Sequence, residues 1–254
     1  MKALWTGAIG FGLVNIPVKL YSGSQSSSLD LDLLDKKDHA RIHYQRVNED
    51  TGKVIDWKNI VKGYKVNGSY VVLTDADFAK ASPEKTRTVA IEAFIDETEI
   101  ESVYYDVPYY LEPAKGGERA YILMREALKK SKKVGVGSFV LRSKEHLCVV
   151  KPYENILLLE KIRFAEEVRK TTELKIPKTK PKAGELSMAL KLIDQQSSSF
   201  DIRQYKDTYT QSLMKFIKTK SKGGRVKEEP PMKVTHRKPK DIMTLLKESI
   251  KKAS

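Results

Sequence analysis

A series of short segments rich in β-branched and aromatic residues constrains the fold of this chain more than any other feature. The pattern predicts strands at residues 86–96, 99–113, 134–142, 145–153 and 154–164. In the first of these, TRTVAIEAFID, apolar and polar side chains alternate as in a strand with one buried face. One helix is predicted among them, at residues 118–133, with an apolar stripe marked by Tyr121, Met124, Arg125 and Leu128. Many short strands with few helices favour a β-barrel or a β-sandwich.

The N-terminal segment predicts one more strand. Residues 5–21 combine a glycine-loosened entry with a strand from Leu13 to Tyr21. Pro17 lies inside this strand, and since proline has no backbone N–H, it restricts the strand to an edge or bulged position. Further along, Leu29–Leu33 alternates apolar and acidic residues as a strand does.

Turn and cap signals follow between residues 60 and 83. The dipeptide Asn67-Gly68 separates two apolar runs, which predicts a two-residue type I′ hairpin turn. Thr74 then suits an N-cap position, so a short helix is predicted from there to a point before Pro83.

A basic hairpin is predicted from Arg41 to Lys65. Arg41, His43 and Gln45 alternate with Ile42 and Tyr44, as in a half-buried strand, and the polar stretch NEDTGK then supplies a turn in which Gly52 provides the positive φ. Residues 36–65 contain eight Lys or Arg and four acidic residues. Such a β-ribbon with a net positive face suits a polyanion. A solvated hairpin in a basic protein is the alternative, and on the hairpin alone we favour it.

The overall charge narrows the class of partner. The formal net charge is +14 and the sequence pI is about 9.5, which point to nucleic acid or, less often, to an anionic membrane. Residues 201–254 contain 15 basic and six acidic residues, so the excess is concentrated towards the C-terminus. The single Cys148 excludes an internal disulfide and fits a reducing cytosol. The N-terminus is no convincing signal peptide, and no apolar run is long enough to span a membrane.

Two amphipathic helices are predicted after a basic, proline-bearing linker that begins near Arg169. The helix at 185–195 has an apolar face of Leu186, Ala189, Leu190 and Ile193. The helix at 205–220 has an apolar stripe of Tyr205, Tyr209, Leu213, Phe216 and Ile217. Both are too apolar on one side to stand free, so they are expected to pack on the strands or on another chain.

A third helix is predicted at residues 241–252, beyond a flexible basic linker. Its apolar face consists of Ile242, Leu245, Leu246 and Ile250. A short amphipathic helix after such a linker is typical of a docking peptide. Folding back onto the chain's own core is the alternative.

The sequence contains no recognisable catalytic or metal-binding motif. His146 and Cys148 share one face of a predicted strand, but without further Cys or a second His motif we assign them to a buried strand rather than to a metal. No catalytic residue, metal site or cofactor is therefore predicted. The one chemistry open to so basic a protein is a lysine Schiff base with the aldehyde of an abasic DNA site, and no particular lysine is indicated.

Several segments, taken together and in order, resemble bacterial Ku. They include WTGAIGFGLVNIPVKLYS, RIHYQRVNEDTGKVIDWKNIVKGY, YVVLTDADF, ASPEKTRT, PYYLEPAKGGERAY, FVLRSKEHL, ELSMALKLIDQ and YKDTYTQSLMKFIKTK. The resemblance covers essentially the whole chain. It implies a mixed, mainly β fold: a central β-barrel with a long bridging β-ribbon and a C-terminal helical arm.

The resemblance also implies a function. Bacterial Ku is a homodimer that closes a ring around duplex DNA, threads onto double-stranded DNA ends and recruits the ATP-dependent ligase D for non-homologous end joining. It is not an enzyme, and a cytoplasmic, nucleoid-associated location is implied. Many relatives carry a long Lys-rich extension that is missing after Ser254, so functions credited to that extension are not expected here.

The resemblance maps onto the chain as three parts. Residues 1–168 are expected to form the barrel with the DNA-bridging ribbon at 33–65, residues 169–222 the linker and dimerisation arm, and residues 223–254 a linker and ligase-docking helix. The dimerisation residues are Leu190, Ile193, Tyr205, Tyr209, Leu213, Phe216 and Ile217, and the docking residues are those of the last helix.

Phosphate contacts should be made by lysines and arginines without reading base sequence. The expected set on the ribbon is Lys36, Lys37, Arg41, Arg46, Lys53, Lys58 and Lys62. A second group of candidates is Lys85, Arg87, Lys115, Arg119, Arg142 and Lys144. Two alternatives remain: an abasic-site lyase, and a sequence-specific regulator of DNA or RNA, for which no helix-turn-helix is visible.

Overall fold

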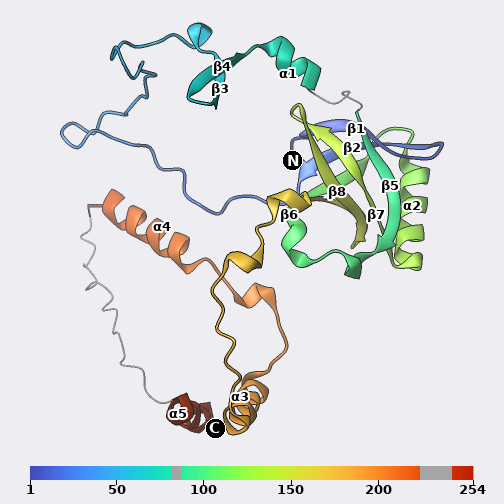
Figure 1. The fold of residues 1–254 in the computed structure, drawn as a ribbon, viewed down its shortest axis with the longest axis vertical. Helices are drawn as coiled ribbons and strands as arrows, with labels where there is room; N and C mark the ends of the chain where they lie inside the picture. The colour runs from blue at the N-terminus through green and yellow to red at the C-terminus, as the bar shows by residue number, and fades with distance from the viewer. Residues whose placement is uncertain (82–86, 224–241, 254) are drawn as a thin grey trace. The chain divides into compact units, whose positions relative to one another are not determined.

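Seven strands form a closed barrel in the order β1-β2-β6-β9-β8-β7-β5, and so the fold is a barrel rather than a sandwich (Figure 1). The computed structural model describes residues 1–81, 87–223 and 242–253. The barrel strands are β1 (Trp5–Phe11), β2 (Val14–Ser22), β5 (Thr88–Asp96), β6 (Tyr105–Pro113), β7 (Lys133–Leu141), β8 (Lys144–Tyr153) and β9 (Ile156–Ile162). Neighbouring strands are antiparallel except β1 and β5, whose parallel pairing of Ile9 with Val89 closes the barrel. The chain leaves the barrel after Ser22 and re-enters it at Thr88.

The barrel core is formed by every second residue of its strands. On β2, Ile16, Val18 and Leu20 are buried, and on β9 Leu157 and Leu159 are fully buried. Successive side chains of a strand point to opposite faces, so the alternating sequence places one apolar set inside. The five strands predicted between residues 86 and 164 are present, but the one predicted at 99–113 begins only at Tyr105, because Ser102–Tyr104 forms a 3₁₀ turn.

The prediction for residues 5–21 was wrong in two respects. The glycine-bearing entry is itself a strand, β1, and β2 pairs with both β1 and β6 instead of lying at an edge. Pro17 is tolerated because its carbonyl accepts a hydrogen bond from Ala114 N at 2.9 Å. The backbone of Pro17 therefore faces β6, and the regular pairing of β6 with β2 begins only at Val18. Because the N–H that proline lacks would also have pointed towards β6, no hydrogen bond to β1 is lost.

Strands β5 and β7 approach each other so closely that a glycine is needed. A Cβ atom on Gly137 would lie 1.9 Å from the carbonyl oxygen of Ala90. The register between these strands also shifts between Ile91 and Ala93. The extra residue lets β5 bend around the barrel, and the absent side chain lets β7 follow it.

Helix α2 (Glu118–Ser131) lies along the barrel and buries Tyr121, Met124 and Leu128, as its predicted stripe requires (Figure 1). The Tyr121 hydroxyl donates to Leu111 O at 2.6 Å and accepts from Leu157 N, also at 2.6 Å. One buried side chain therefore ties the helix to β6 and β9. Burial raises the pKa of this phenol above its usual value.

We expect Tyr121→Phe to lower the free energy of unfolding by about 1–3 kcal/mol, because it leaves a buried N–H and a buried carbonyl without their partner. Urea denaturation followed by circular dichroism measures this change. Tyr44→Phe removes a hydroxyl from an exposed tyrosine and should stay within about 0.5 kcal/mol of the parent. Equal midpoints for the two variants would contradict the pinning role of Tyr121.

Between β2 and β5 the structure contains one short hairpin and one short helix. Strands β3 (Lys62–Val66) and β4 (Ser69–Leu73) meet at the predicted turn, where Asn67 and Gly68 both have positive φ. Helix α1 (Asp75–Ala81) begins at Thr74, whose hydroxyl accepts from Asp77 N at 3.3 Å while the Asp77 carboxylate accepts from Thr74 N at 2.9 Å. This is a capping box, and it confirms the predicted helix start.

The strands predicted at 29–33 and 41–45 are absent. These stretches are almost wholly exposed and form only the isolated bridge between Leu34 and Arg41. A second isolated bridge joins Val47 and Val54 around the turn at Gly52, whose φ is 65° as predicted. Alternation alone was misleading, because no neighbouring strand pairs with these residues in a single chain.

The remaining helices belong to a second compact unit. Contacts divide the chain into residues 1–26 with 31–170, and residues 27–30 with 171–254. The second unit contains α3 (Ala183–Gln196), α4 (Thr208–Ser221) and α5 (Ile242–Ala253), and α3 packs against α5. Single 3₁₀ turns occur at Trp57–Asn59, Glu97–Glu99, Ser102–Tyr104, Ala165–Glu167, Thr171–Glu173 and Ile202–Gln204.

Helix α4 begins later than predicted. The Asp207 carboxylate accepts from Thr210 N at 2.9 Å and caps the helix, so Tyr205 lies outside it. Tyr205 instead contacts the ring of Phe200, with centroids 5.6 Å apart. Among the described residues, no helix is long and apolar enough to cross a membrane.

Candidate nucleic-acid interface

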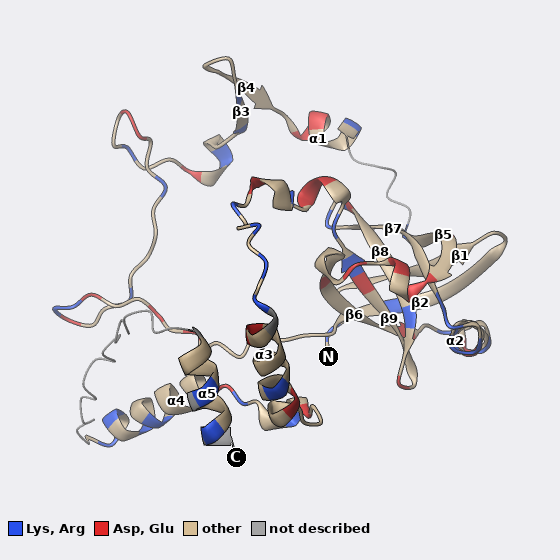
Figure 2. Cartoon of the chain, turned by 60° about the horizontal axis from the view of Figure 1, so that its bottom comes forward, with Lys and Arg blue, Asp and Glu red and all other residues tan. Residues whose placement is uncertain are grey.

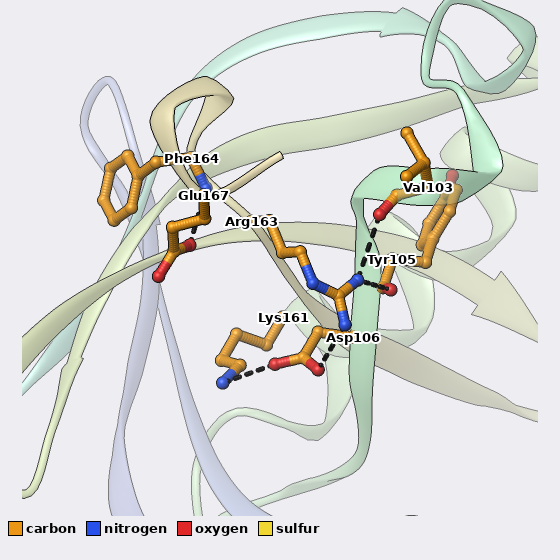
Figure 3. A network of polar contacts seen from close by, with 7 residues as sticks. All are labelled: Val103, Tyr105, Asp106, Lys161, Arg163, Phe164 and Glu167. Atoms are coloured by element: carbon orange, nitrogen blue, oxygen red, sulfur yellow. Dashed lines mark hydrogen bonds and ion pairs between the residues drawn. The ribbon is translucent and has the colours of Figure 1, made fainter. Parts of the chain in front are cut away.

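Basic residues on the barrel wall are bound to carboxylates of the barrel itself. Asp106 accepts from Lys161 Nζ at 2.6 Å and from Arg163 Nη2 at 2.9 Å (Figure 3). Arg163 also donates to the carbonyls of Val103 and Tyr105. The hydrogen bond from Lys161, helped by Arg163, holds the pKa of Asp106 below its usual value. These cations tie β6 to β9 and are not available for phosphate.

Lys151 is bound in the same way. Its ammonium lies 2.6 Å from Glu97 Oε1 and 3.2 Å from Glu160 Oε2. Burial lowers the pKa of Lys151, but the two carboxylates outweigh burial and raise it overall. Exposed cations without a carboxylate partner are therefore the better candidates for binding a polyanion.

The turns of residues 31–54 present such cations. Lys36 and Lys37 lie in a turn closed by the hydrogen bond from Asp35 N to Ala40 O at 2.8 Å. Lys53 follows a second turn, in which the Asn48 side chain accepts from the backbone N–H of Thr51 at 2.9 Å. All three lysines are exposed, and none forms an ion pair within the described part of the chain.

The other predicted ribbon cations have neighbours of two kinds. Arg41 is 2.5 Å from Asp32, and Lys58 is 4.0 Å from Asp56, so a phosphate would compete with a carboxylate at both positions. Arg46 lies over the ring of Trp57, 4.3 Å from its centroid.

Lys62 likewise lies over Phe78, at 4.8 Å from the ring centroid. A ring face attracts the cation without neutralising it, so the charges of Arg46 and Lys62 remain available.

The structure places all seven predicted residues on one exposed stretch but does not gather them into a cleft. The aromatic neighbours Trp57 and Phe78 were missed by the sequence analysis, although both are exposed. For Trp57 the sequence did contain a signal, namely the predicted turn at Gly52. This turn brings Arg46 opposite Ile55, whose N–H bonds to Arg46 O, and Trp57 follows Ile55 by two residues.

The second group of candidates is spread over the barrel. Arg87, Lys115 and Arg119 are exposed, and Lys85 lies outside the described residues. Arg142 lies in the tight turn between β7 and β8, and Lys144 is the first residue after it. Arg142 and Ser143, the two residues of the turn, both have positive φ. A left-handed conformation is unfavourable for such residues and is held here by the hairpin.

No metal site is found among the described residues, where no group of three or more His, Cys, Asp or Glu is suitably placed. Cys148 is fully buried, and burial raises the pKa of its thiol. His146, on the same strand, packs against Phe139 with ring centroids 5.7 Å apart. Burial, with Lys161 and Lys144 nearby, lowers the pKa of His146.

The residues predicted for dimerisation leave a large apolar surface open. Tyr209 is 74% exposed and Ile193 60% exposed, and Leu190, Phe216 and Ile217 are also exposed, with only Leu213 half-buried. Tyr205 is exposed but lies outside the α4 stripe. On α4 the exposed residues Tyr209, Phe216 and Ile217 share one stripe with Leu213, and monomeric proteins rarely leave a large contiguous apolar surface exposed.

The residues predicted for docking are partly covered. Leu246 and Ile250 are half-buried in α5, which packs on α3, while Leu245 is 38% exposed. Ile242 is the first residue of α5, and Asp241 lies outside the described residues. On α3 the half-buried residues are Met188, Ala189 and Leu192, and Leu190 and Ile193 lie on a neighbouring, exposed side.

Comparison with known proteins gives a consistent result. The profile of the family described as Ku70/Ku80 beta-barrel domain matches residues 10–188. The chain is 41% identical to the non-homologous end joining protein Ku of Coxiella burnetii, over 98% of this chain and 94% of that protein. It is 40% identical to the protein of the same name from Cupriavidus necator, over 98% and 77%, and 39% identical to that of Opitutus terrae, over 98% and 91%.

Among solved structures, the SPOC domain of human PHD-finger protein 3 matches at 12% identity, over 63% of this chain and 95% of that chain. Its TM-score is 0.31, which is too low to carry an argument.

Proposed function

Since the chain belongs to the Ku family and acts in non-homologous end joining of DNA, we propose that it is a non-enzymatic homodimeric ring that binds double-stranded DNA ends and recruits ligase D. The observation that carries the DNA-binding part is the exposed stretch from Lys36 to Lys62. Its lysines are mostly free of carboxylate partners among the described residues, whereas Lys151, Lys161 and Arg163 on the barrel are bound to Asp106, Glu97 and Glu160.

Recognition would rest on phosphate contacts. Lysine and arginine bound to phosphates release counterions and carry no information about base sequence, so binding should be sequence-blind and salt-dependent. Preference for ends would come from topology, because a closed ring loads only where a duplex stops. A lone ribbon without a core of its own needs a second chain to complete such a ring.

The apolar sides of α3 and α4 support the homodimer. In a two-fold dimer each chain buries the same surface, and the exposed residues Leu190 and Ile193 on α3 and Tyr209, Phe216 and Ile217 on α4 are the candidates. The apolar side of α3 that is covered by α5 is a different one. Dimerisation through Leu190 and Ile193 is therefore compatible with α5 remaining on α3.

Recruitment of the ligase would use α5. Its apolar face contains Leu246 and Ile250, and a helix presented beyond a linker suits a hydrophobic groove on a partner. Since both side chains are half-buried where α5 packs on α3, docking would exchange the α3 surface for the ligase surface.

The ring is tested by one duplex in two forms, linear and covalently closed circular, at moderate salt. We expect tight binding to the linear form and at least about tenfold weaker binding to the circle, because a circle has no end onto which a ring can load. Only contacts between its phosphates and basic residues on the outer surface of the protein would remain. Titration by mobility shift measures both affinities. Equal affinity for the two forms would mean an open basic surface and would exclude the ring.

A further inference from the structure

Helix α4 has two opposite faces of different chemistry. At 3.6 residues per turn, Lys215, Lys218 and Lys222 fall on the side opposite Leu213, which lies at the centre of the apolar stripe. Lys222 is the residue at the C-terminal cap. All three lysines are exposed, together with Gln211 on the same side. We call Lys215, Lys218 and Lys222 the α4 lysine face; Figure 2 shows that α4 carries several basic residues and no acidic ones.

The charges of the α4 lysine face are not compensated within the described part of the chain. Helix α4 contains no Asp or Glu, and the acidic residue that directly precedes it, Asp207, is bound at the N-terminal cap. None of the three lysines forms an ion pair among the described residues. Like charges three and four residues apart destabilise a helix by about 0.2–0.5 kcal/mol per pair.

The helix dipole accounts for only part of this arrangement. Cations in the last turn are stabilised by the partial negative charge at a helix C-terminus, which covers Lys218 and Lys222. Lys215 lies further inside the helix, where the dipole has little effect. A self-repelling row that spans about 10 Å of helix suits a polyanion with closely spaced charges, and duplex DNA offers about six phosphates over that length.

We propose that the α4 lysine face is a second contact surface for the phosphate backbone of duplex DNA, separate from the ribbon. The proposal rests on the proposed function in one respect: if the apolar stripe of α4 is buried in the dimer, the lysines point away from the partner chain and stay open to DNA. The contact would add to the salt-dependent affinity that the ribbon supplies.

The test is the triple variant Lys215→Gln, Lys218→Gln and Lys222→Gln, which removes three charges and keeps good helix formers. The control is Lys129→Gln, Lys130→Gln and Lys132→Gln, which removes three exposed charges at the end of α2. Binding to a short linear duplex is followed by fluorescence anisotropy between about 50 and 200 mM salt, the range over which phosphate contacts change affinity strongly. Light scattering reports the oligomeric state of both variants.

We expect the slope of log K against log salt to become shallower by about 0.9 for each lost phosphate contact, hence by about 2–3 in the α4 variant and by none in the control. A dimeric α4 variant with the same slope and affinity as the control would overturn the proposal. So would an α4 variant that has become monomeric, because its lysines would then act at the interface. The slope is read on linear DNA, so it remains informative even if the preference for linear over circular DNA fails.

Discussion

Leu213→Asp combined with Phe216→Asp is expected to give a monomer that no longer binds DNA ends. Both side chains lie on the apolar stripe of α4, and a carboxylate buried there without a partner costs several kcal/mol. Two such carboxylates in each chain should raise the dimer dissociation constant by at least about 10³-fold, since about 1.4 kcal/mol corresponds to each factor of ten. Light scattering measures the mass, and a mobility shift on linear duplex measures end binding.

The matched control introduces the same two charges elsewhere on α4. Thr208→Asp with Gln211→Asp places them on the side of the helix opposite Leu213, on exposed positions, and should leave the protein dimeric. Its DNA affinity is not the readout, because Gln211 shares the side of the α4 lysine face. A Leu213/Phe216 variant that keeps the dimer mass would contradict the assignment of α4 to the dimer interface.

Leu245→Asp combined with Leu246→Asp should abolish stimulation of ligase D and leave the affinity for DNA ends unchanged. Both residues belong to α5, and the charges would make its apolar face unfit for a hydrophobic groove. Joining of linear DNA by the ligase, with and without this protein, measures the stimulation. Binding of the same DNA without ligase measures the end affinity.

Leu192→Asp is the control for this second prediction. Leu192 is half-buried on the side of α3 that faces α5, so the variant weakens the α3–α5 packing without altering α5. Stimulation should then be retained, because α5 is released with its apolar face intact. Loss of stimulation in Leu192→Asp as complete as in the α5 variant would show that the folding of the second unit, rather than docking by α5, is required.

The sequence predicted those elements whose signal is local and whose partner is near in the chain. Asn67-Gly68 brings together two strands that adjoin it, and Thr74 caps a helix that starts beside it. The barrel strands after residue 86 were predicted because their alternation is matched by neighbours that also alternate. The closure of β1 against β5 was not predicted, because nothing near Ile9 indicates that its partner is Val89.

Where prediction failed, the local pattern lacked a partner or met a stronger signal. Residues 41–45 alternate like a strand, yet no strand of the same chain pairs with them beyond one isolated bridge. Tyr205 matched the helical period, but Asp207 caps the helix after it. For the candidate DNA surface, composition indicated a segment that the structure shows to be exposed. It did not distinguish Lys53, which has no acidic partner in the described structure, from Arg41, which is bound to Asp32.

The excursion of the chain between Ser22 and Thr88 has a consequence for how the protein can vary. Both ends of this excursion are fixed in the barrel: Gly23 N bonds to Pro108 O, Arg87 O accepts from Ala8 N, and the barrel closes through the pairing of β1 with β5. Lengthening a surface loop within it is inexpensive, since each doubling of loop length costs only about 0.6 kcal/mol of closure entropy. In the proposed ring, insertion or deletion in the excursion would therefore change the aperture around a duplex while the pairing of the barrel strands stays the same.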